Sequence, residues 1–494
     1  MTDIVASRSP FIDGAFVRGE GDPFTVIDPA TEEVTAEVES SSADQVHAAI
    51  AAARRAFDDG PWPQMSTDER ADALGRFVDA LEARRDLLVE TVIAEAGCPR
   101  AFTELMQVGM GLISSRDHLA LARRLPEWEH NELPLTEYTA GNKVKLSIRR
   151  YEPVGVVAAI TPSNFPLTTN LWKIIPALVT GCTVVLRPSP LTPLEATVLG
   201  DAADDADLPR GALNVITEHV PTGAQILSTH PDVDLVSFTG STAVGRMIAE
   251  QAAPSMKRLV LELGGKSVQL YLADALEGGP MPAVGGAYGV FFGHAGQGCS
   301  HQTRMLVPQD QKATVLDALG AMASSLTVGD TRDASTVVGP VVSAGSRDRI
   351  EGLVAQGVDA GGRVVAGGAR PSHLDRGFFY EPTVVDIDDN ANPLAQTEIF
   401  GPVITVQGYR DLDEAIAITN DSPYDLSGGV YTRDLNAGLA LTSRFRTGTV
   451  QVNVGAASAF TPMGGYRQSG IGRERGVLGI REFQLAKHVV VGTM

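Results

Sequence analysis

Apolar residues recur at helical spacing along much of the first hundred residues. Residues 43–57 are rich in alanine, and Ser66 precedes Glu69 by three positions, the spacing of a capping box at a helix start. Behind this cap the periodic pattern runs to Glu95, shortly before Gly97, and its apolar members are Leu74, Phe77, Leu81, Leu87, Leu88 and Val92. The pattern predicts one helix in the first segment and a long helical stretch in the second.

The period changes to two near residues 137–151. Leu146 and Ile148 alternate with polar residues beyond a Gly141-Asn142 turn, which predicts an amphipathic β-hairpin. An isolated hairpin is only marginally stable in water, so its apolar side needs a partner, such as a neighbouring subunit. The tail segment Lys487–Val491 predicts an edge strand that also needs pairing.

Short apolar runs alternate with helix-length segments between residues 154 and 263. This alternation predicts an α/β fold, with a parallel sheet covered by helices on both faces, and a similar rhythm over 264–465 predicts a second α/β domain. Ligands bind outside the carboxyl ends of such strands, so chemistry is expected just after each of them. The strand-like runs of the first domain are Val154–Ile160, Cys182–Leu186, Asn214–Ile216, Leu235–Phe238 and Arg258–Leu263.

The composition narrows the class of protein. The 494 residues are 44% hydrophobic and 20% charged, and the net charge of -20 is unfavourable for binding nucleic acid or an anionic membrane. No apolar run approaches the ~20 residues of a membrane span, and residues 1–8 lack a signal-peptide core, so a cytoplasmic protein is expected. Cys98, Cys182 and Cys299 form no CxxC pair, which argues against a disulfide framework or a structural zinc site, and no metal is expected.

Three separate segments carry candidate catalytic side chains, each with an ordinary alternative. Cys299 lies among small residues that would let a substrate approach its sulfur, although most isolated cysteines are buried hydrophobes. Glu262 ends an apolar strand, where desolvation would suit it to act as a base, or it pairs with Lys266. Asn164 follows the first strand and could donate to an oxyanion, or it belongs to a turn between two prolines.

A possible phosphate site follows the strand Leu235–Phe238. Gly240 permits a tight turn, and Ser241 can cap a helix whose free N–H groups would face a phosphate. The spacing G-S-x-x-x-G is not the full dinucleotide fingerprint, so an ordinary capped turn remains the alternative.

Taken together and in this order, the motifs resemble the aldehyde dehydrogenase superfamily along essentially the whole chain. The segments that carry the resemblance are Thr161–Pro166, Phe238–Thr242, Glu262–Ser267, Gly296–Cys299, Glu398–Pro402 and Gly464–Gly470. Six independent motifs hardly align by chance. The resemblance implies a Rossmann-like cofactor domain, an α/β catalytic domain and a β-hairpin oligomerisation arm.

The resemblance also implies domain boundaries and an assembly. Residues 1–131 with 152–263 would form the dinucleotide-binding domain, 264–465 the catalytic domain, and 132–151 with 466–494 the oligomerisation or bridging segments. A homodimer or homotetramer is then expected.

The resemblance implies that an aldehyde is oxidised to a carboxylic acid with NAD(P)+. Cys299 would add to the aldehyde as a nucleophile, while Asn164 and the Cys299 backbone N–H stabilise the oxyanion. After hydride loss to the nicotinamide, Glu262 would activate the water that hydrolyses the Cys299 thioester. Relatives that transfer the acyl group to coenzyme A generally lack this glutamate. Lys173 matches a family lysine near the active site, although it could equally cover a helix face.

The family's cofactor contacts map onto this chain with one departure. The usual Lys-Pro-x-Glu after the second strand is replaced here by Arg187, Pro188, Ser189 and Pro190. A lost carboxylate and a gained arginine leave NADP open, but NAD is expected, since proline adds no phosphate contact. The implied cofactor-binding residues are Thr161, Pro162, Ser163, Arg187, Ser189, Gly240, Ser241, Leu263, Gly264, Glu398 and Phe400.

The expected substrate pocket combines polar and aromatic side chains. The residues assigned to it are Phe165, Thr169, Phe292, Ser300 and Phe460, and which aldehyde they select stays open. His294 and His301 flank Cys299, but neither matches a family catalytic position. Two other functions remain as alternatives: a cysteine-dependent hydrolase or thioesterase, and a non-catalytic binding protein on the same scaffold.

Overall fold

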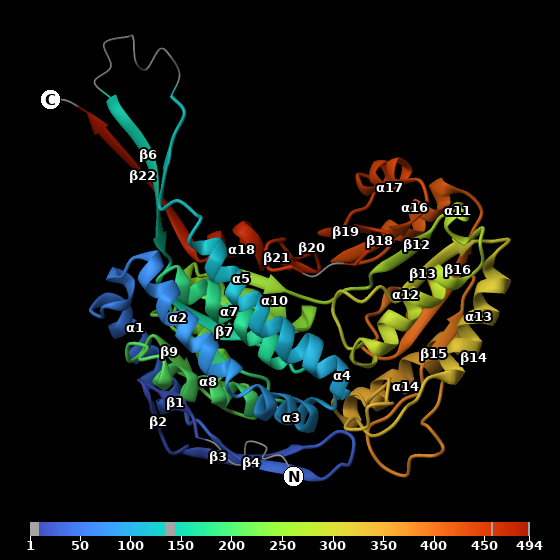
Figure 1. Ribbon diagram of the computed structural model, residues 1–494, viewed down its shortest axis with the longest axis horizontal. Helices are drawn as coiled ribbons and strands as arrows, with labels where there is room; N and C mark the ends of the chain where they lie inside the picture. Colours follow the sequence, from blue (N-terminus) through green and yellow to red (C-terminus); the bar gives the residue numbers. More distant parts are fainter. Residues whose placement is uncertain (1–8, 134–143, 456–457, 493–494) are drawn as a thin grey trace.

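The computed structural model describes residues 9–133, 144–455 and 458–492. Within these residues two α/β layers lie side by side, and a small antiparallel sheet projects from the first of them (Figure 1). In spatial order, the first sheet consists of β2 (Ala15–Phe16), β1 (Phe11–Ile12), β9 (Leu213–Val215), β8 (Thr183–Arg187), β7 (Val156–Ile160), β10 (Leu235–Thr239), β11 (Arg258–Glu262) and β21 (Gly470–Ile471). Its five central strands, β9 to β11, are parallel, which confirms the predicted sheet.

The two faces of this sheet are covered by different helices, because alternate residues of a strand point in opposite directions. Val157 and Ala159 of β7 join one core, whereas Val156, Ala158 and Ile160 join the other. The first core includes α2 (Thr67–Glu82), α3 (Arg85–Ala96), α5 (Met110–Ala122), α7 (Pro166–Val179) and α8 (Leu194–Asp205), and the second includes α1 (Ala43–Asp58), α9 (Thr222–Thr229) and α10 (Thr242–Ala252). The sheet is therefore buried on both sides.

The long periodic stretch predicted from residue 66 is two helices, α2 and α3, which corrects the single-segment interpretation. Ser66 and Glu69 form the expected capping box, but α2 ends at Glu82, and Arg84 precedes α3 with non-helical backbone angles. Leu81 and Leu88 lie on opposite sides of this break and are both fully buried in the same core. The apolar period therefore continues through a turn that it does not reveal.

The second sheet carries the predicted second α/β rhythm. In spatial order its strands are β14 (Arg363–Ala366), β15 (Thr383–Asp386), β16 (Val403–Tyr409), β13 (Arg304–Pro308), β12 (Val268–Tyr271), β18 (Ser427–Tyr431) and β19 (Thr449–Val452). All neighbours are parallel except β14 and β15. The helices of this layer are α11 (Ala273–Leu276), α12 (Met281–Phe292), α13 (Lys312–Ser325), α14 (Ala344–Asp359), α15 (Pro393–Gln396), α16 (Leu412–Asn420) and α17 (Leu435–Thr442).

Shorter elements complete the described chain. They are β3 (Gly21–Ile27) paired with β4 (Val34–Ser40), η1 (Trp62–Gln64), α4 (Arg100–Phe102), the π-helix η2 (Thr103–Gly109), η3 (Ala253–Ser255), η4 (His294–Gly296), β17 (Tyr424–Asp425) paired with β20 (Tyr466–Arg467), and α18 (Gly476–Glu482). No helix of the described residues is long and apolar enough to cross a membrane.

The projecting sheet joins the tail of the chain to the alternating segment. Its strands are β22 (Gln484–Gly492), β6 (Val144–Pro153) and β5 (Trp128–His130), in that order and antiparallel. The tail strand thus finds the partner that it was expected to need, and both strands extend away from the body of the molecule (Figure 1). The predicted Gly141-Asn142 turn lies outside the described residues.

Two glycines in the first helices should respond to alanine in opposite directions. Gly97 ends α3 with φ 66°, and a Cβ there would lie 2.7 Å from Cγ of Pro340. Gly97→Ala should lower the free energy of unfolding by about 1–3 kcal/mol. Gly75 lies within α2 with nothing outside its own helix within 4 Å of an added Cβ, so Gly75→Ala should raise it by about 0.5–1 kcal/mol. Denaturant unfolding measures both changes, and shifts of the same sign would contradict this account of the two glycines.

Candidate active site

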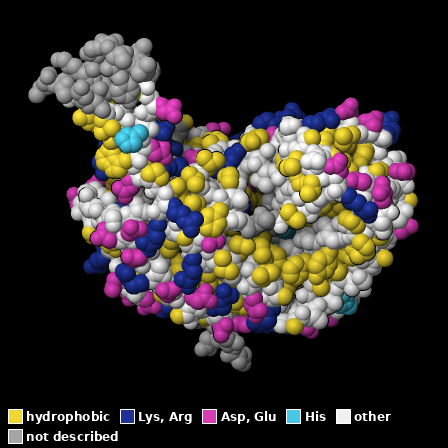
Figure 2. Space-filling view, turned by 45° about the horizontal axis from the view of Figure 1, so that its top comes forward, with side chains coloured by type: hydrophobic (Ala, Val, Ile, Leu, Met, Phe, Trp, Pro, Cys, Tyr) yellow, Lys and Arg dark blue, Asp and Glu magenta, His cyan; other side chains and the backbone are white. Residues whose placement is uncertain are grey.

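A cavity of about 330 Å³ lies where the two α/β layers meet, and three of the predicted catalytic residues come together around it. Cys299 and Asn164 line it, and Glu262 contacts Cys299 from the end of β11. The surface of the molecule is hollowed between the two layers, with hydrophobic side chains along the rim (Figure 2). Segments more than a hundred residues apart therefore share one site.

Cys299 lies on the loop between η4 and β13. Its Sγ is 3.8 Å from Oε1 of Glu262, and part of the side chain remains open to the cavity. Gly265 allows the loop this close, because a Cβ there would lie 2.3 Å from the Cys299 carbonyl oxygen. Burial raises the pKa of the thiol well above its usual value, and the charges of Glu262, Glu398 and Glu474 raise it further. The resting sulfur is therefore protonated at neutral pH.

Glu262 ends β11 and is 2% exposed. Burial raises the pKa of its carboxyl well above the usual value, and so does Glu474, whereas Lys173 acts in the opposite direction. Its Oε2 atom is buried and has no hydrogen-bond partner among the described residues. One oxygen thus faces the thiol and the other is free to bind a proton or a water molecule.

Asn164 follows β7, as the predicted βα organisation requires. Its Nδ2 donates a hydrogen bond of 2.7 Å to the carbonyl oxygen of Gln297, two residues before the thiol. The backbone carbonyl oxygen of Asn164 accepts a hydrogen bond of 2.7 Å from Nε2 of Gln107. The amide is fixed by these contacts, and since Nδ2 carries two hydrogens, its second N–H is left for a ligand.

Lys173 lies on α7 behind the cavity and is 1% exposed. Its Nζ forms an ion pair with Glu474 and donates to Oγ of Ser237 at 3.2 Å. Sequence reasoning did not identify Glu474, which lies in the segment assigned to assembly. Its only signal was a glutamate next to the Gly464–Gly470 motif, too weak to place it in the active site.

The residues expected around a dinucleotide gather at the carboxyl edge of the first sheet. Ser241 caps α10 by accepting from Val244 N, so the exposed start of this helix can receive a phosphate. Oγ1 of Thr161 is buried without a partner among the described residues, and Pro162 and Ser163 follow it. Gly240 could not be replaced freely, because a Cβ would lie 2.4 Å from the ring of Phe238. These features fit a dinucleotide.

Glu398 lies beside the turn that follows β11. Its Oε1 accepts from the backbone N–H of Gly265 at 2.9 Å, and a Cβ on Gly264 would lie 2.7 Å from its Oε2. Leu263 precedes this turn, and Phe400 follows Glu398 with φ 60°, a conformation unusual for a bulky residue. The two glycines thus admit a carboxylate close to the strand that carries Glu262.

Arg187 is already paired with a carboxylate. It ends β8, and its Nε lies 3.0 Å from Oε1 of Glu218, which follows the adjacent strand β9. Glu218 also accepts from the backbone N–H groups of Gly223 and Ala224 at 2.6 and 3.0 Å. Ser189, two residues after Arg187 in the chain, is also buried. Sequence reasoning missed Glu218, because its partner lies 31 residues away.

Three of the five predicted pocket residues line the cavity: Phe165, Thr169 and Ser300. Phe292 does not line the cavity. Its ring packs edge-on against the ring of Phe102, which is part of the cavity wall. Phe460 is 43% exposed and is also outside the cavity lining. Lining residues that sequence reasoning missed include Phe102, Met106, Trp172, His301, Met463 and Arg475.

The two histidines near Cys299 are neutral. Burial lowers the pKa of His294 to about 3 and that of His301 to about 4. His301 lies in the cavity wall beside Gly293 and Gly298, whereas His294 contacts the side chain of Gln297. Neither forms a hydrogen bond with the thiol among the described residues, which leaves Glu262 as the neighbouring base.

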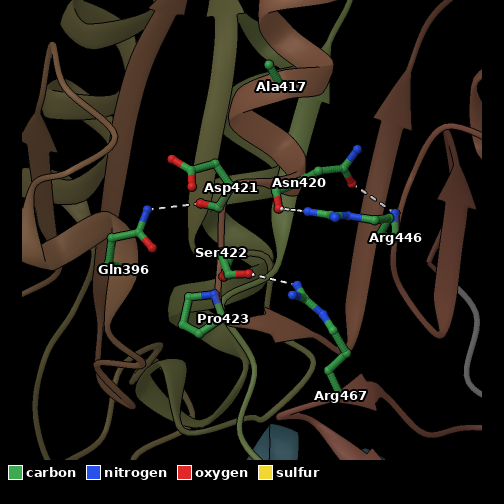
Figure 3. A pocket seen from close by; sticks show the side chains of 8 residues that line it. All are labelled: Gln396, Ala417, Asn420, Asp421, Ser422, Pro423, Arg446 and Arg467. Carbon is green, nitrogen blue, oxygen red and sulfur yellow. Dashed lines mark hydrogen bonds between the residues drawn. The ribbon is translucent and has the colours of Figure 1, made fainter.

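A second, more open hollow of about 530 Å³ lies at the end of α16 (Figure 3). Arg446 donates to the carbonyl oxygen of Asn420 at 2.6 Å, and Arg467 donates to that of Ser422 at 3.0 Å and pairs with Asp425. These side chains cap a helix end and hold loops together. The lining contains no thiol, so the chemistry belongs to the other cavity.

Comparisons with known proteins agree with this geometry. The profile of the aldehyde dehydrogenase family matches residues 16–489. Geranial dehydrogenase of Castellaniella defragrans is 38% identical over 94% of each chain, and 3-succinoylsemialdehyde-pyridine dehydrogenase of a Pseudomonas species is 37% identical over 98% of each. The crystal structure of a Mycobacterium tuberculosis aldehyde dehydrogenase complexed with NAD+ superposes with a TM-score of 0.93, at 38% identity over 99% of each chain.

The raised pKa of Cys299 predicts a strong pH dependence of its alkylation. Since only the thiolate reacts, the rate of modification by iodoacetamide should rise about tenfold per pH unit between pH 6 and 9. Cys98, whose pKa burial raises to about 12, and the buried Cys182 should stay unmodified and serve as internal controls. Peptide mass spectrometry measures each site. A rate at Cys299 that is already maximal at pH 6 would contradict the assignment of a protonated resting thiol.

Proposed function

The chain belongs to the aldehyde dehydrogenase family, an NAD(P)-dependent family that oxidises aldehydes to carboxylic acids, and we propose that Cys299, Glu262 and Asn164 carry out this reaction here. The observation that carries the proposal is the 3.8 Å contact between Sγ of Cys299 and Oε1 of Glu262, at a cavity that Asn164 also lines. A thiol, a base and an amide donor are the groups that acyl chemistry on a carbonyl carbon requires.

In the first half of the reaction the sulfur attacks the aldehyde carbon. The thiol is protonated at rest, so its proton must leave as the C–S bond forms, and Oε1 of Glu262 is the nearest described acceptor. The aldehyde oxygen then becomes an oxyanion, which the free N–H of the Asn164 amide and the backbone N–H of Cys299 stabilise. One donor of this kind typically contributes about 2.7–4 kcal/mol to the transition state.

The residues at the edge of the first sheet would hold the dinucleotide. Ser241 and the start of α10 would bind its phosphates, and Glu398 and Phe400 would contact its nicotinamide half. Gly240 and Gly264 would leave room for it, and the unpartnered Oγ1 of Thr161 would donate a hydrogen bond to it. NAD+, when bound, accepts a hydride, which is one proton with two electrons, from the substrate carbon. The acyl group then remains on Cys299 as a thioester.

In the second half Glu262 activates water. Its raised pKa makes it a strong enough base to take a proton from water that attacks the thioester, which releases the carboxylic acid and frees the thiol. Lys173 and Glu474 lie behind it, and we assign them as positioning residues, because they act on the charge of Glu262 and do not line the cavity.

We also propose the division of the chain and its assembly. The first sheet supports a cofactor domain of residues 1–131 and 152–263, and the second a catalytic domain of 264–465. Residues 132–151 and 466–494 would bridge subunits of a dimer or tetramer, because β22 is an edge strand with exposed Leu485, Val490 and Val491. The tail also brings Glu474 to the site. A cytoplasmic location remains a prediction.

Variants of the two reacting residues should fail in different ways. Cys299→Ala should form no reduced cofactor with any aldehyde, because no bond to the substrate can form. Glu262→Gln should give a slower burst of about one equivalent per subunit, because the thiol has lost its nearest described proton acceptor, and then stall at the thioester. Stopped-flow absorbance of the reduced nicotinamide separates these outcomes, with Cys182→Ala as a fully active control. Steady-state turnover by either variant would refute the assignment, and a burst in Glu262→Gln as fast as that of the unsubstituted enzyme would refute the role of Glu262 as acceptor of the thiol proton.

Glu218 supports a preference for NAD over NADP. Family members use a glutamate directly after the second strand, and this chain lacks it, but Glu218 brings a carboxylate to the same edge from the neighbouring strand. This carboxylate pairs with Arg187, the one cationic side chain of the Arg187-Pro-Ser189-Pro segment. The pair has no net charge, so Arg187 has no free charge to offer the additional phosphate of NADP.

Glu218→Gln should therefore raise the affinity for NADP+ about tenfold and change that for NAD+ only a few-fold, because it removes one negative charge and frees Arg187. Calorimetric titration of the cofactors without aldehyde measures this directly. Adding Arg187→Met should abolish the gain, and Glu250→Gln, which removes an exposed charge from α10, should have no effect. Equal binding of NAD+ and NADP+ by the unsubstituted protein would refute the proposal.

A further inference from the structure

We propose that this enzyme prefers aldehydes that carry a carboxylate, and that Arg475 binds that carboxylate inside the cavity. The inference rests on the proposed function, because it assigns the substrate class of the same site. Three observations carry it: an arginine that no described carboxylate pairs with, a backbone that fixes its position, and a cavity whose exposed wall is mostly apolar.

Arg475 lines the cavity that contains Cys299 and is only 8% exposed. Its guanidinium stacks over the ring of Trp172 at 4.7 Å, and Nε1 of Trp172 donates to Oγ of Ser114 at 2.9 Å, so the stacking plane is held in place. Within residues 9–133, 144–455 and 458–492, no carboxylate lies within ion-pair distance of Arg475, and its Nε is buried without a hydrogen-bond partner. A guanidinium fork is thus left unsatisfied in the active site.

The neighbouring acid is not available to satisfy it. Glu474 precedes Arg475 in the chain, but its carboxylate is paired with Lys173 on the other side of the segment. Buried charges are normally paired, since an uncompensated one is strongly destabilising. A ligand that brings its own anion removes this deficit, and a carboxylate matches the planar fork in a bidentate manner.

The backbone holds Arg475 in a conformation that side-chain packing alone would not select. Its φ of 61° and ψ of 168° lie in a region that is almost restricted to glycine. Both flanks are fixed: Glu474 and Met463 exchange backbone hydrogen bonds of 2.8 and 2.7 Å, and Gly476 N donates to Ala459 O at 2.7 Å. Such strain persists where surrounding contacts over-determine it, and here it keeps the side chain in the cavity wall.

The rest of the cavity suits the body of such a substrate. Phe102, Phe165 and Met463 supply apolar surface for hydrocarbon or an aromatic ring, while Cys299 and Asn164 mark the place of the aldehyde. An apolar body with an aldehyde at one end and an anion at the other satisfies all of these groups at once. An uncharged aldehyde would leave Arg475 unpaired.

A different role for Arg475 would be to stabilise the thiolate of Cys299 or the carboxylate of Glu262. Among the described residues, neither the Cys299 sulfur nor the Glu262 carboxylate lies within ion-pair distance of Arg475. Both are still close enough to interact electrostatically with its charge. The two roles differ in what they predict. A residue that activates the thiol changes the reaction of every aldehyde, whereas a residue that binds a substrate carboxylate changes only one class.

The test compares two aldehydes of similar shape, 4-formylbenzoate and 4-methylbenzaldehyde. The unsubstituted enzyme should show a kcat/KM at least about tenfold higher for the carboxylate. Arg475→Met should lower kcat/KM for 4-formylbenzoate about 100-fold, mainly through KM, and leave that for 4-methylbenzaldehyde within a few-fold. Arg475→Lys, which keeps the charge but not the fork, should recover part of the loss.

Arg473→Met is the matched control, because Arg473 stacks on Tyr466 outside the cavity and should not change the ratio of the two substrates. The pH profile of Cys299 alkylation should shift only slightly in Arg475→Met, because the charge of Arg475 acts on the thiol from beyond ion-pair distance. An equal kcat/KM for the two aldehydes, an equal loss for both in Arg475→Met, or an alkylation profile shifted by more than about one pH unit would overturn the inference. Oxidation of neither aldehyde would instead overturn the proposed function.

Discussion

The catalytic cavity depends on holding a buried carboxyl 3.8 Å from a thiol that is only partly open to the cavity. Burial favours the protonated form of both groups, so a negative charge on one makes the other harder to ionise. Losing both protons is therefore unfavourable for the pair, whereas losing one is easier. Glu262 is the nearby group that can accept a proton from the sulfur. Neither residue creates this situation alone, because Glu262 ends a strand of the first sheet and Cys299 lies on a loop leading into the second. The site exists only because the two layers pack against each other.

The segment from β21 to β22 helps to hold the active site together, although it is far from Cys299 and Glu262 in the sequence. β21 pairs with β11 directly at Glu262, where Gly470 is the partner residue, and β22 then continues into the projecting sheet. Between these strands lie Glu474 and Arg475. One of them completes a buried ion pair with Lys173, whose charge opposes that of Glu474 on Glu262. The same segment thus pairs with the strand of the base, adjusts the charge around it and contributes to the wall of the cavity.

The sequence predicts local features well and long-range pairings poorly. The five parallel strands, the capping box at Ser66 and the tail strand follow from periodicity and local chemistry, which act within a few residues. The break between α2 and α3 is invisible to the same reasoning, because the apolar period continues across it. Motif resemblance brings Cys299, Glu262 and Asn164 into one site. Glu218 and Arg475 do not belong to those motifs. The importance of Glu218 depends on a partner 31 residues away, and that of Arg475 on an anion that none of the described residues supplies.

These two residues also show why an arginine has to be judged by its partners. Arg187 is paired with Glu218, which is itself held by two backbone N–H groups, so the charge of Arg187 is neutralised before any ligand approaches. Within the described parts of the chain Arg475 has only the face of an aromatic ring, which stabilises a cation without neutralising it. The first arginine therefore gives an added phosphate no free charge to bind, whereas the second attracts an anion. The same side chain differs in selectivity because the protein supplies a carboxylate in one case and leaves it to the substrate in the other.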